Sequence, residues 1–173
     1  MKKISNIHYT DAYYILENGD DFVVKLPHNE AYGRIENGKN GSFVIHFIDK
    51  VENLAFSKNK RSSLIVKGLV LPNAAVLSKS KGGFIEGLES LVYGQKISLT
   101  WSDVVYAENE TRNECSKMYT EGTVFRNNQD NIVILNPETI RIHPQPIKNH
   151  PSIKPAYYVI PKAFVTSFEL FKI

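Results

Sequence analysis

The sequence predicts an all-β protein whose strands are mainly antiparallel. Short apolar segments rich in Val, Ile, Phe and Tyr recur along the 173 residues, and runs of Asn, Asp, Gly and Pro separate them. Only one stretch, residues 84–94, carries apolar residues at helical spacing. Roughly ten to twelve short strands with one short helix are typical of barrels and sandwiches.

Two Glu-Asn-Gly turns, 19 residues apart, predict two hairpins near the N-terminus. Residues 12–16 and 22–26 flank the first turn, and residues 32–35 and 42–48 flank the second. Both central residues of a type I′ turn need a positive φ, which Asn and Gly tolerate. The two hairpins together predict a meander.

The middle of the chain predicts a strand, the helix and a bent or divided strand. Residues 64–71 are an apolar run that ends at a Pro-Asn pair. Residues 84–92 place Phe, Ile, Leu and Val at helical spacing, and Gly94 follows them as the expected C-cap. Residues 96–101 and 104–106 predict either one bent strand or two strands.

The last third of the chain again shows strand signals. Residues 123–126 and 131–135 flank an Asn-Asn-Gln-Asp turn, and residues 139–143 predict a further strand. Four prolines between residues 144 and 155 predict an extended crossing at an edge or on the surface. Residues 156–171 predict two strands separated by a turn at a proline.

The order of elements from residue 120 onward is similar to that of small SH3-like or Sm-like barrels, with an Ile-Pro step before the last strand. We therefore expect one or two such barrels with one short helix. With two units, residues 1–94 form a β meander with basic loops and the helix, and residues 95–173 form the barrel. A single domain is the alternative, because domains span roughly 50 to 250 residues.

Composition and sequence pattern exclude several classes of protein. Hydrophobic residues make up 42% and charged residues 23% of the chain, which argues against disorder. The N-terminus reaches Asp11 before a signal peptide's apolar region could form, and no run approaches about 18 apolar residues. A single cysteine, Cys115, cannot form an internal disulfide. We expect a cytoplasmic protein that does not enter a membrane.

Motifs for catalysis, metals and cofactors are missing, so we expect no cofactor, no metal and no catalytic residue. Residues 33–40 approximate a phosphate-binding loop, but Asn40 replaces the required hydroxyl and a strand follows. His143 and His150 lie in the Pro-rich segment without metal-ligand spacing. An enzyme is therefore the last of three hypotheses about the function, after the two binding roles described next. A pocket that joins Cys115 to a histidine would favour an enzyme.

One long stretch of the chain carries charge of a single sign. No acidic residue occurs between Glu52 and Glu86. The cations of this stretch are Lys58, Lys60, Arg61, Lys67, Lys79 and Lys81. Contacts between such side chains and phosphates give salt-dependent affinity. The first hypothesis is therefore a non-catalytic module that contacts a nucleic-acid backbone through these basic loops.

Two adjacent tyrosine pairs favour a second hypothesis. The pairs are Tyr13-Tyr14 and Tyr157-Tyr158. Neighbouring residues of a strand face opposite sides, so we expect one tyrosine of each pair to face outward, and tyrosine is enriched at protein interfaces. The alternative function is a small protein-binding inhibitor or adaptor, of the immunity or anti-defence type, that uses this sheet face or edge.

Overall fold

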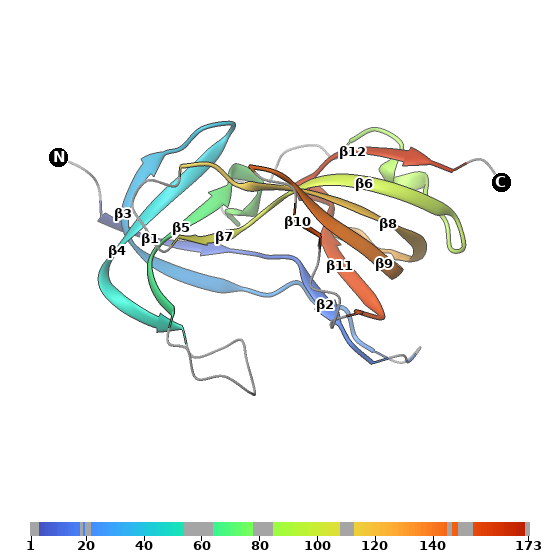
Figure 1. The fold of residues 1–173 in the computed structure, drawn as a ribbon, viewed down its shortest axis with the longest axis horizontal. Helices are drawn as coiled ribbons and strands as arrows, with labels where there is room; N and C mark the ends of the chain where they lie inside the picture. Colours follow the sequence, from blue (N-terminus) through green and yellow to red (C-terminus); the bar gives the residue numbers. More distant parts are fainter. Residues whose placement is uncertain are drawn as a thin grey trace.

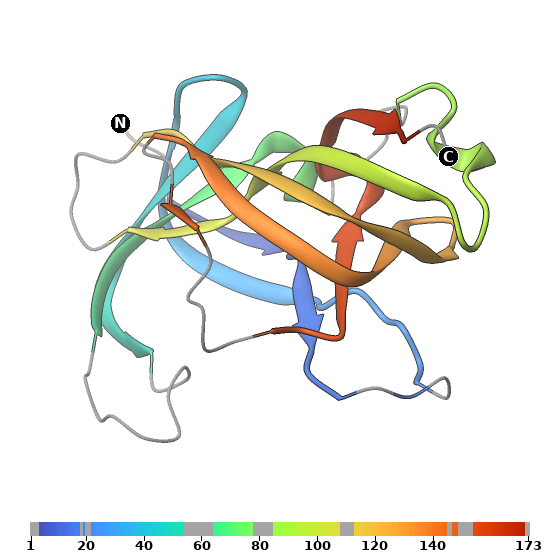
Figure 2. The ribbon, with the colours of Figure 1, turned by 45° about the vertical axis from the view of Figure 1, so that its right-hand side comes forward.

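The structure is a computed structural model that describes residues 4–17, 19, 22–53, 64–77, 85–107, 113–144, 147–148 and 154–171. Within these residues it contains twelve strands, all paired antiparallel, in two sheets (Figures 1 and 2). No helix in this part of the chain is long and apolar enough to cross a membrane. The all-β, mainly antiparallel class predicted from the sequence is confirmed.

The first sheet, called sheet A, has five strands in the order β1-β3-β4-β5-β7. These are β1 (Ile4–Tyr9), β3 (Asn29–Asn37), β4 (Ser42–Asn53), β5 (Leu64–Pro72) and β7 (Val105–Ala107). The second sheet, called sheet B, follows the order β12-β6-β8-β9-β11-β2, and β10 (Ile147–Lys148) pairs with β9. Its strands are β12 (Val165–Leu170), β6 (Lys96–Asp103), β8 (Ser116–Asn127), β9 (Asn131–His143), β11 (Tyr157–Pro161) and β2 (Tyr13–Ile15).

Neither sheet closes into a barrel within the described residues. Sheet A ends at β1 and β7, and sheet B ends at β12 and β2, so each has two edge strands. A barrel needs hydrogen bonds between its first and last strands, and those pairings do not occur here. The expected SH3-like or Sm-like barrel is therefore not confirmed.

The chain changes sheet five times, after β1, β2, β5, β6 and β7, and two of these crossings are short. Residues 10–12 connect β1 of sheet A to β2 of sheet B, and Val104 connects β6 of sheet B to β7 of sheet A. Between the sheets lies one main apolar core, which contains residues from both sides of the predicted boundary at Gly94, for example Leu69 and Leu99. The boundary itself stays a prediction.

The second predicted hairpin is confirmed. Strands β3 and β4 pair antiparallel, with Asn37 opposite Phe43. The reversal occurs at Asn40 and Gly41, whose φ values are 52° and 71°. These two residues supply the left-handed conformations that the turn needs.

The first predicted hairpin is wrong. Strand β2 pairs with β11 instead, and residues 22–26 form no strand. Their apolar side chains, including Phe22 and Val24, pack on the outer face of sheet B. The alternation that predicted a strand therefore reflects side-chain packing without a backbone ladder.

The predicted helix is also wrong over its described residues. The segment forms only the 3-10 turn η2 (Leu88–Ser90). Gly87, inside the predicted helix, has a φ of 86°, which no α-helix accommodates. The φ of 87° at Gly94 is the left-handed conformation expected of a C-cap glycine. The other 3-10 turns, η1 (Asn73–Ala75) and η3 (Lys162–Phe164), precede a bridge and β12.

Several other strands are where the sequence predicts them. Strands β5, β11 and β12 match their predicted segments, and residues 96–107 form two strands, β6 and β7. Residues 139–143 are the second half of β9 and not a separate strand. Most of the Pro-rich crossing lies outside the described residues.

A buried chain of hydrogen bonds joins the central strands of sheet B. Trp101 is fully buried, and its Nε1 donates to Thr120 Oγ1 at 3.0 Å. The Thr120 and Thr139 hydroxyls lie 2.9 Å apart. These contacts fix the face of β6 that points into the core.

Thr120→Val tests this chain of hydrogen bonds. The replacement keeps the side-chain shape but leaves the buried Trp101 N–H without an acceptor, so we expect the free energy of unfolding to fall by about 1–3 kcal/mol. Thr123→Val, at a partly exposed position of the same strand, is the control. Urea denaturation measures both, and equal losses in the two variants would contradict the assigned role.

Candidate functional site

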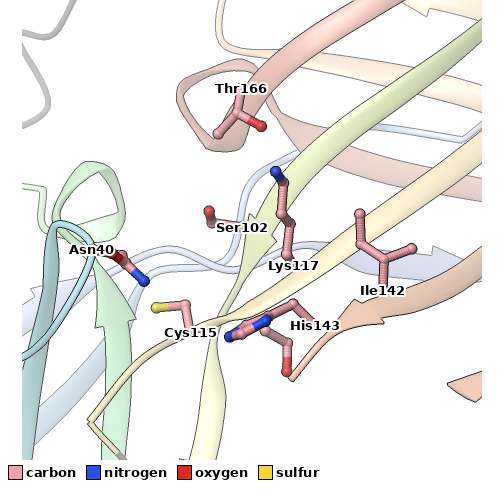
Figure 3. Close-up of a pocket in the computed structure, with 8 residues that line it drawn as sticks. Asn40, Ser102, Cys115, Lys117, Ile142, His143 and Thr166 are labelled. Carbon is pink, nitrogen blue, oxygen red and sulfur yellow. The ribbon is translucent and has the colours of Figure 1, made fainter. Parts of the chain in front are cut away.

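An open cavity of about 550 Å³ lies where the outer face of sheet B meets the β3–β4 turn (Figure 3). Strands β6, β8, β9 and β12 and the turn all contribute to its wall. The lining residues are Asn40, Ser102, Cys115, Ser116, Lys117, Ile142, His143 and Thr166. Most of these side chains are polar, and Lys117 carries a positive charge.

Strand register explains why three of the lining residues lie together. Ser102 of β6 is opposite Lys117 of β8, and Lys117 is opposite His143 of β9. Their neighbours Trp101 and Met118 point into the core, so Ser102 and Lys117 point outward. In Figure 3 the Lys117 side chain extends past Ser102 toward Thr166 of β12.

A β-bulge brings a further residue of β9 to the cavity. The register shifts where Lys117 pairs with His143 while Met118 pairs with Arg141. Ile142 is the extra residue, and a bulge of this kind redirects adjacent side chains. Ile142 and His143 therefore both line the cavity, which simple alternation would forbid.

The β3–β4 turn is tied to the segment before β8. The Lys39 N–H donates to the Asn113 carbonyl at 2.6 Å, and Ser42 Oγ donates to the same carbonyl at 3.1 Å. These two bonds hold Asn113, and with it Glu114, beside the turn. One side of the cavity is thereby attached to sheet A.

Glu114 connects the two sheets at the cavity through its carboxylate, a contact called here the Glu114 bridge. Glu114 Oε1 lies 3.1 Å from His143 Nε2, and Oε2 accepts from Asn40 Nδ2 at 3.1 Å. The hydrogen bond from His143 is the largest cause that lowers the pKa of Glu114. The bridge therefore favours the ionised carboxylate.

Cys115 shares the cavity with a histidine, the arrangement that would favour an enzyme. Its side chain packs with Val44, Val70 and Val105 of sheet A. In Figure 3 the sulfur points toward Asn40 and away from the His143 imidazole. Nucleophilic catalysis needs the base within hydrogen-bond reach of the sulfur, so this orientation does not support a Cys–His pair.

The outer face of sheet B changes sign along its strands. Glu169, Glu121 and Glu138 lie in one cross-strand row, with Ser98 between the first two. This acidic row is four residues, about 13 Å, from the row that contains Lys117. The cavity is therefore the end of this face that suits an anion.

The predicted basic surface lies almost wholly outside the described residues. Lys67 belongs to β5. Lys58, Lys60, Arg61, Lys79 and Lys81 all lie outside the described residues. The contribution of these six side chains to binding stays a prediction.

The structure places the four predicted interface tyrosines on β2 and β11. Tyr14 is 43% exposed and pairs with Tyr158, whose ring packs 5.4 Å from Trp101. Tyr13 and Tyr157 lie on the opposite, outer face of sheet B, where Tyr157 is buried. Tyr14 is thus the one exposed member of the set, and an interface role for the four stays a prediction.

Tyr13 and Tyr157 belong to a second apolar cluster, called here the outer patch. Its buried members are Val133, Ala156, Tyr157 and Val159, and its partly buried members are Tyr13, Ile15, Phe22, Val24, Leu26, Phe125 and Leu135. The Arg126 guanidinium lies 4.7 Å from the Phe22 ring. The ring of Tyr93, which is 73% exposed, packs 6.1 Å from Phe125. Most side chains of the outer patch are therefore only partly buried among the described residues.

Two partly buried carboxyl groups, Asp11 and Asp103, lie at the two short crossings between the sheets, after β1 and after β6. Asp103 follows Ile97, Leu99 and Trp101 on the core-facing side of β6. Burial raises the pKa of Asp11 to about 7 and that of Asp103 to about 8, and the Asp11 charge adds to the second shift. The described residues contain no group of three or more His, Cys, Asp or Glu side chains that could hold a metal ion.

Comparisons with known proteins identify no relative. No protein-family model, no curated protein and no solved structure matches the chain.

The two carboxyl groups predict a falling stability as the pH rises. Both pKa values in the folded state lie above the ordinary 3.8, so their contribution is complete below about pH 4 and is lost as the pH rises through 7 to 8. We expect the free energy of unfolding to fall by at least about 1 kcal/mol between pH 5 and pH 9. Urea denaturation across this range measures it.

Asp103→Asn should flatten this pH dependence, because the amide does not titrate. Asp130→Asn, at an exposed position in the β8–β9 turn, should leave it unchanged. An equal slope in the wild type and in Asp103→Asn would contradict the assignment.

Proposed function

We propose that the protein is a non-catalytic module that binds a nucleic-acid backbone, with the cavity as one of its phosphate-contacting sites. The observation that carries this proposal is the row Ser102–Lys117–His143, which Asn40 and Thr166 flank. An ammonium, hydroxyl groups, an amide and an imidazole are the donors that phosphate oxygens accept from.

The charge of Lys117 is available to a ligand. The Lys117 side chain is exposed in the cavity wall. Within the described part of the chain, no carboxylate forms an ion pair with the Lys117 ammonium. Lys39 of the β3–β4 turn is a second nearby cation, because its charge lowers the pKa of Glu114. Together they favour an anion at this end of sheet B.

The acidic row limits the path of a bound strand. A backbone that ran along the outer face of sheet B would meet Glu121, Glu138 and Glu169. The proposed strand therefore leaves the cavity on the side of the β3–β4 turn. Contacts from the basic loops at residues 58–61 and 79–81 would add to the affinity. Phosphate contacts carry no sequence information, so we propose binding without marked sequence preference.

Lys117→Gln tests the cavity. Fluorescence anisotropy of labelled single-stranded and duplex oligonucleotides at about 50 and 200 mM salt should show weaker binding, with the salt slope reduced by about 1. Lys96→Gln, at the opposite end of β6, removes an equal charge and should change the affinity less. Equal effects of the two substitutions would exclude the cavity as a specific contact.

The basic loops need a variant of their own. Replacing Lys58, Lys60, Arg61, Lys79 and Lys81 together with Gln should weaken binding more than Lys117→Gln, because five cations are removed. Anisotropy at the lower salt concentration measures the difference. Absence of binding by the wild type at about 50 mM salt would overturn the nucleic-acid proposal.

A protein partner is the second candidate, and the outer patch favours it. Exposed Tyr93 and Val23 adjoin a cluster whose members are mostly half-buried. Aromatic residues and arginine, which this patch combines, are enriched at protein interfaces. Under this proposal the protein acts as an inhibitor or adaptor.

Tyr93→Ser tests the second candidate. A partner captured by the tagged wild type in fixed stoichiometry should be lost with this variant, because the exposed ring is removed from the patch. Tyr32→Ser, which removes a tyrosine of comparable exposure from sheet A, should retain the partner. Loss of the partner with both variants, or with neither, would contradict binding at the patch.

A further inference from the structure

We propose that the Glu114 carboxylate occupies the cavity's donors in place of a phosphate, so that the Glu114 bridge is an autoinhibitory contact that a bound anion displaces. This inference rests on the proposed function, because it concerns regulation of the same site. The ligand class is an oxyanion, either inorganic phosphate or a phosphate of a nucleic acid.

The geometry of the bridge supports this role. Glu114 accepts from Asn40 Nδ2 and lies within hydrogen-bond distance of His143 Nε2, at 3.1 Å each. Asn40 lies in the β3–β4 turn of sheet A, His143 belongs to β9 of sheet B, and both line the cavity. An oxyanion with two accessible oxygens can accept the same two hydrogen bonds. The carboxylate and a phosphate therefore compete for one pair of donors.

Electrostatics adds to the competition. The bridge keeps Glu114 ionised, since the pKa of Glu114 is lowered chiefly by the hydrogen bond from His143. A carboxylate a few ångströms from the ligand's position repels a second anion. Lys117 takes no part in the bridge and stays available to attract the ligand.

The bridge can open without disruption of the fold. The Glu114 and His143 side chains are 26% and 47% exposed, so water replaces their contact at small cost. The backbone beside Glu114 is held independently, because Asn113 accepts hydrogen bonds from Lys39 and Ser42. Rotation of the Glu114 side chain alone would release both donors.

Glu114→Gln tests the inference. The amide keeps the shape of the side chain and removes the competing charge, so we expect oligonucleotide affinity at about 50 mM salt to rise roughly fivefold or more. Glu138→Gln is the matched control, since it removes an exposed negative charge from the acidic row of sheet B, away from the cavity. Anisotropy measures the affinity of both variants, and inorganic phosphate serves as competitor.

The outcomes separate the two proposals. Binding by the wild type that Glu114→Gln strengthens no more than Glu138→Gln would overturn the autoinhibitory role and leave the proposed function intact. Absence of binding by the wild type and by both variants would overturn both proposals.

A second measurement uses the wild type alone. Titration with inorganic phosphate should shift the NMR signals of the His143 ring and the Asn40 side-chain amide, because phosphate displaces Glu114 from both groups. Unchanged signals at saturating phosphate would overturn the displacement of Glu114.

Discussion

Trp101 is fully buried in the core between the two sheets, and its position determines which residues of β6 face the cavity. Its indole N–H donates to Thr120, and its ring packs against Tyr158. Trp101 lies three residues before Val104, where the chain passes from sheet B into sheet A. This burial fixes the core-facing side of β6. Once that side is fixed, alternation directs Ser102 outward, and strand register places Lys117 and His143 beside it.

Local signals in the sequence predicted those parts of the fold that depend on neighbouring residues. The Asn- and Gly-rich run at residues 36–41 predicted a hairpin, and within that run Asn40 and Gly41, not the Glu-Asn-Gly residues, adopt the left-handed conformations of the turn. The pairing of β2 with β11 joins segments more than 140 residues apart, and no local pattern encodes it. The predicted helix was wrong because Gly87 adopts a left-handed conformation between apolar residues that otherwise have helical spacing.

The candidate site was the least predictable feature, since its residues come from five separate segments. The sequence placed His143 at the start of the Pro-rich segment without a partner, whereas the register at a bulge in β9 places it opposite Lys117. Outside the cavity, one signal was present in the sequence for the buried carboxyl group: Asp103 continues the alternation of Ile97, Leu99 and Trp101 on the core-facing side of β6. The binding roles that the sequence predicted for the basic stretch and for the two tyrosine pairs stay predictions.

The proposed function requires that a nucleic-acid phosphate binds in the cavity and not at the outer patch. The most direct measurement is NMR chemical-shift mapping of the isotope-labelled protein during titration with a short single-stranded oligonucleotide. We expect the largest backbone shifts at Asn40, Lys117 and His143, with small shifts at Tyr93 and Phe125. Large shifts at the outer patch with none in the cavity would overturn phosphate binding in the cavity.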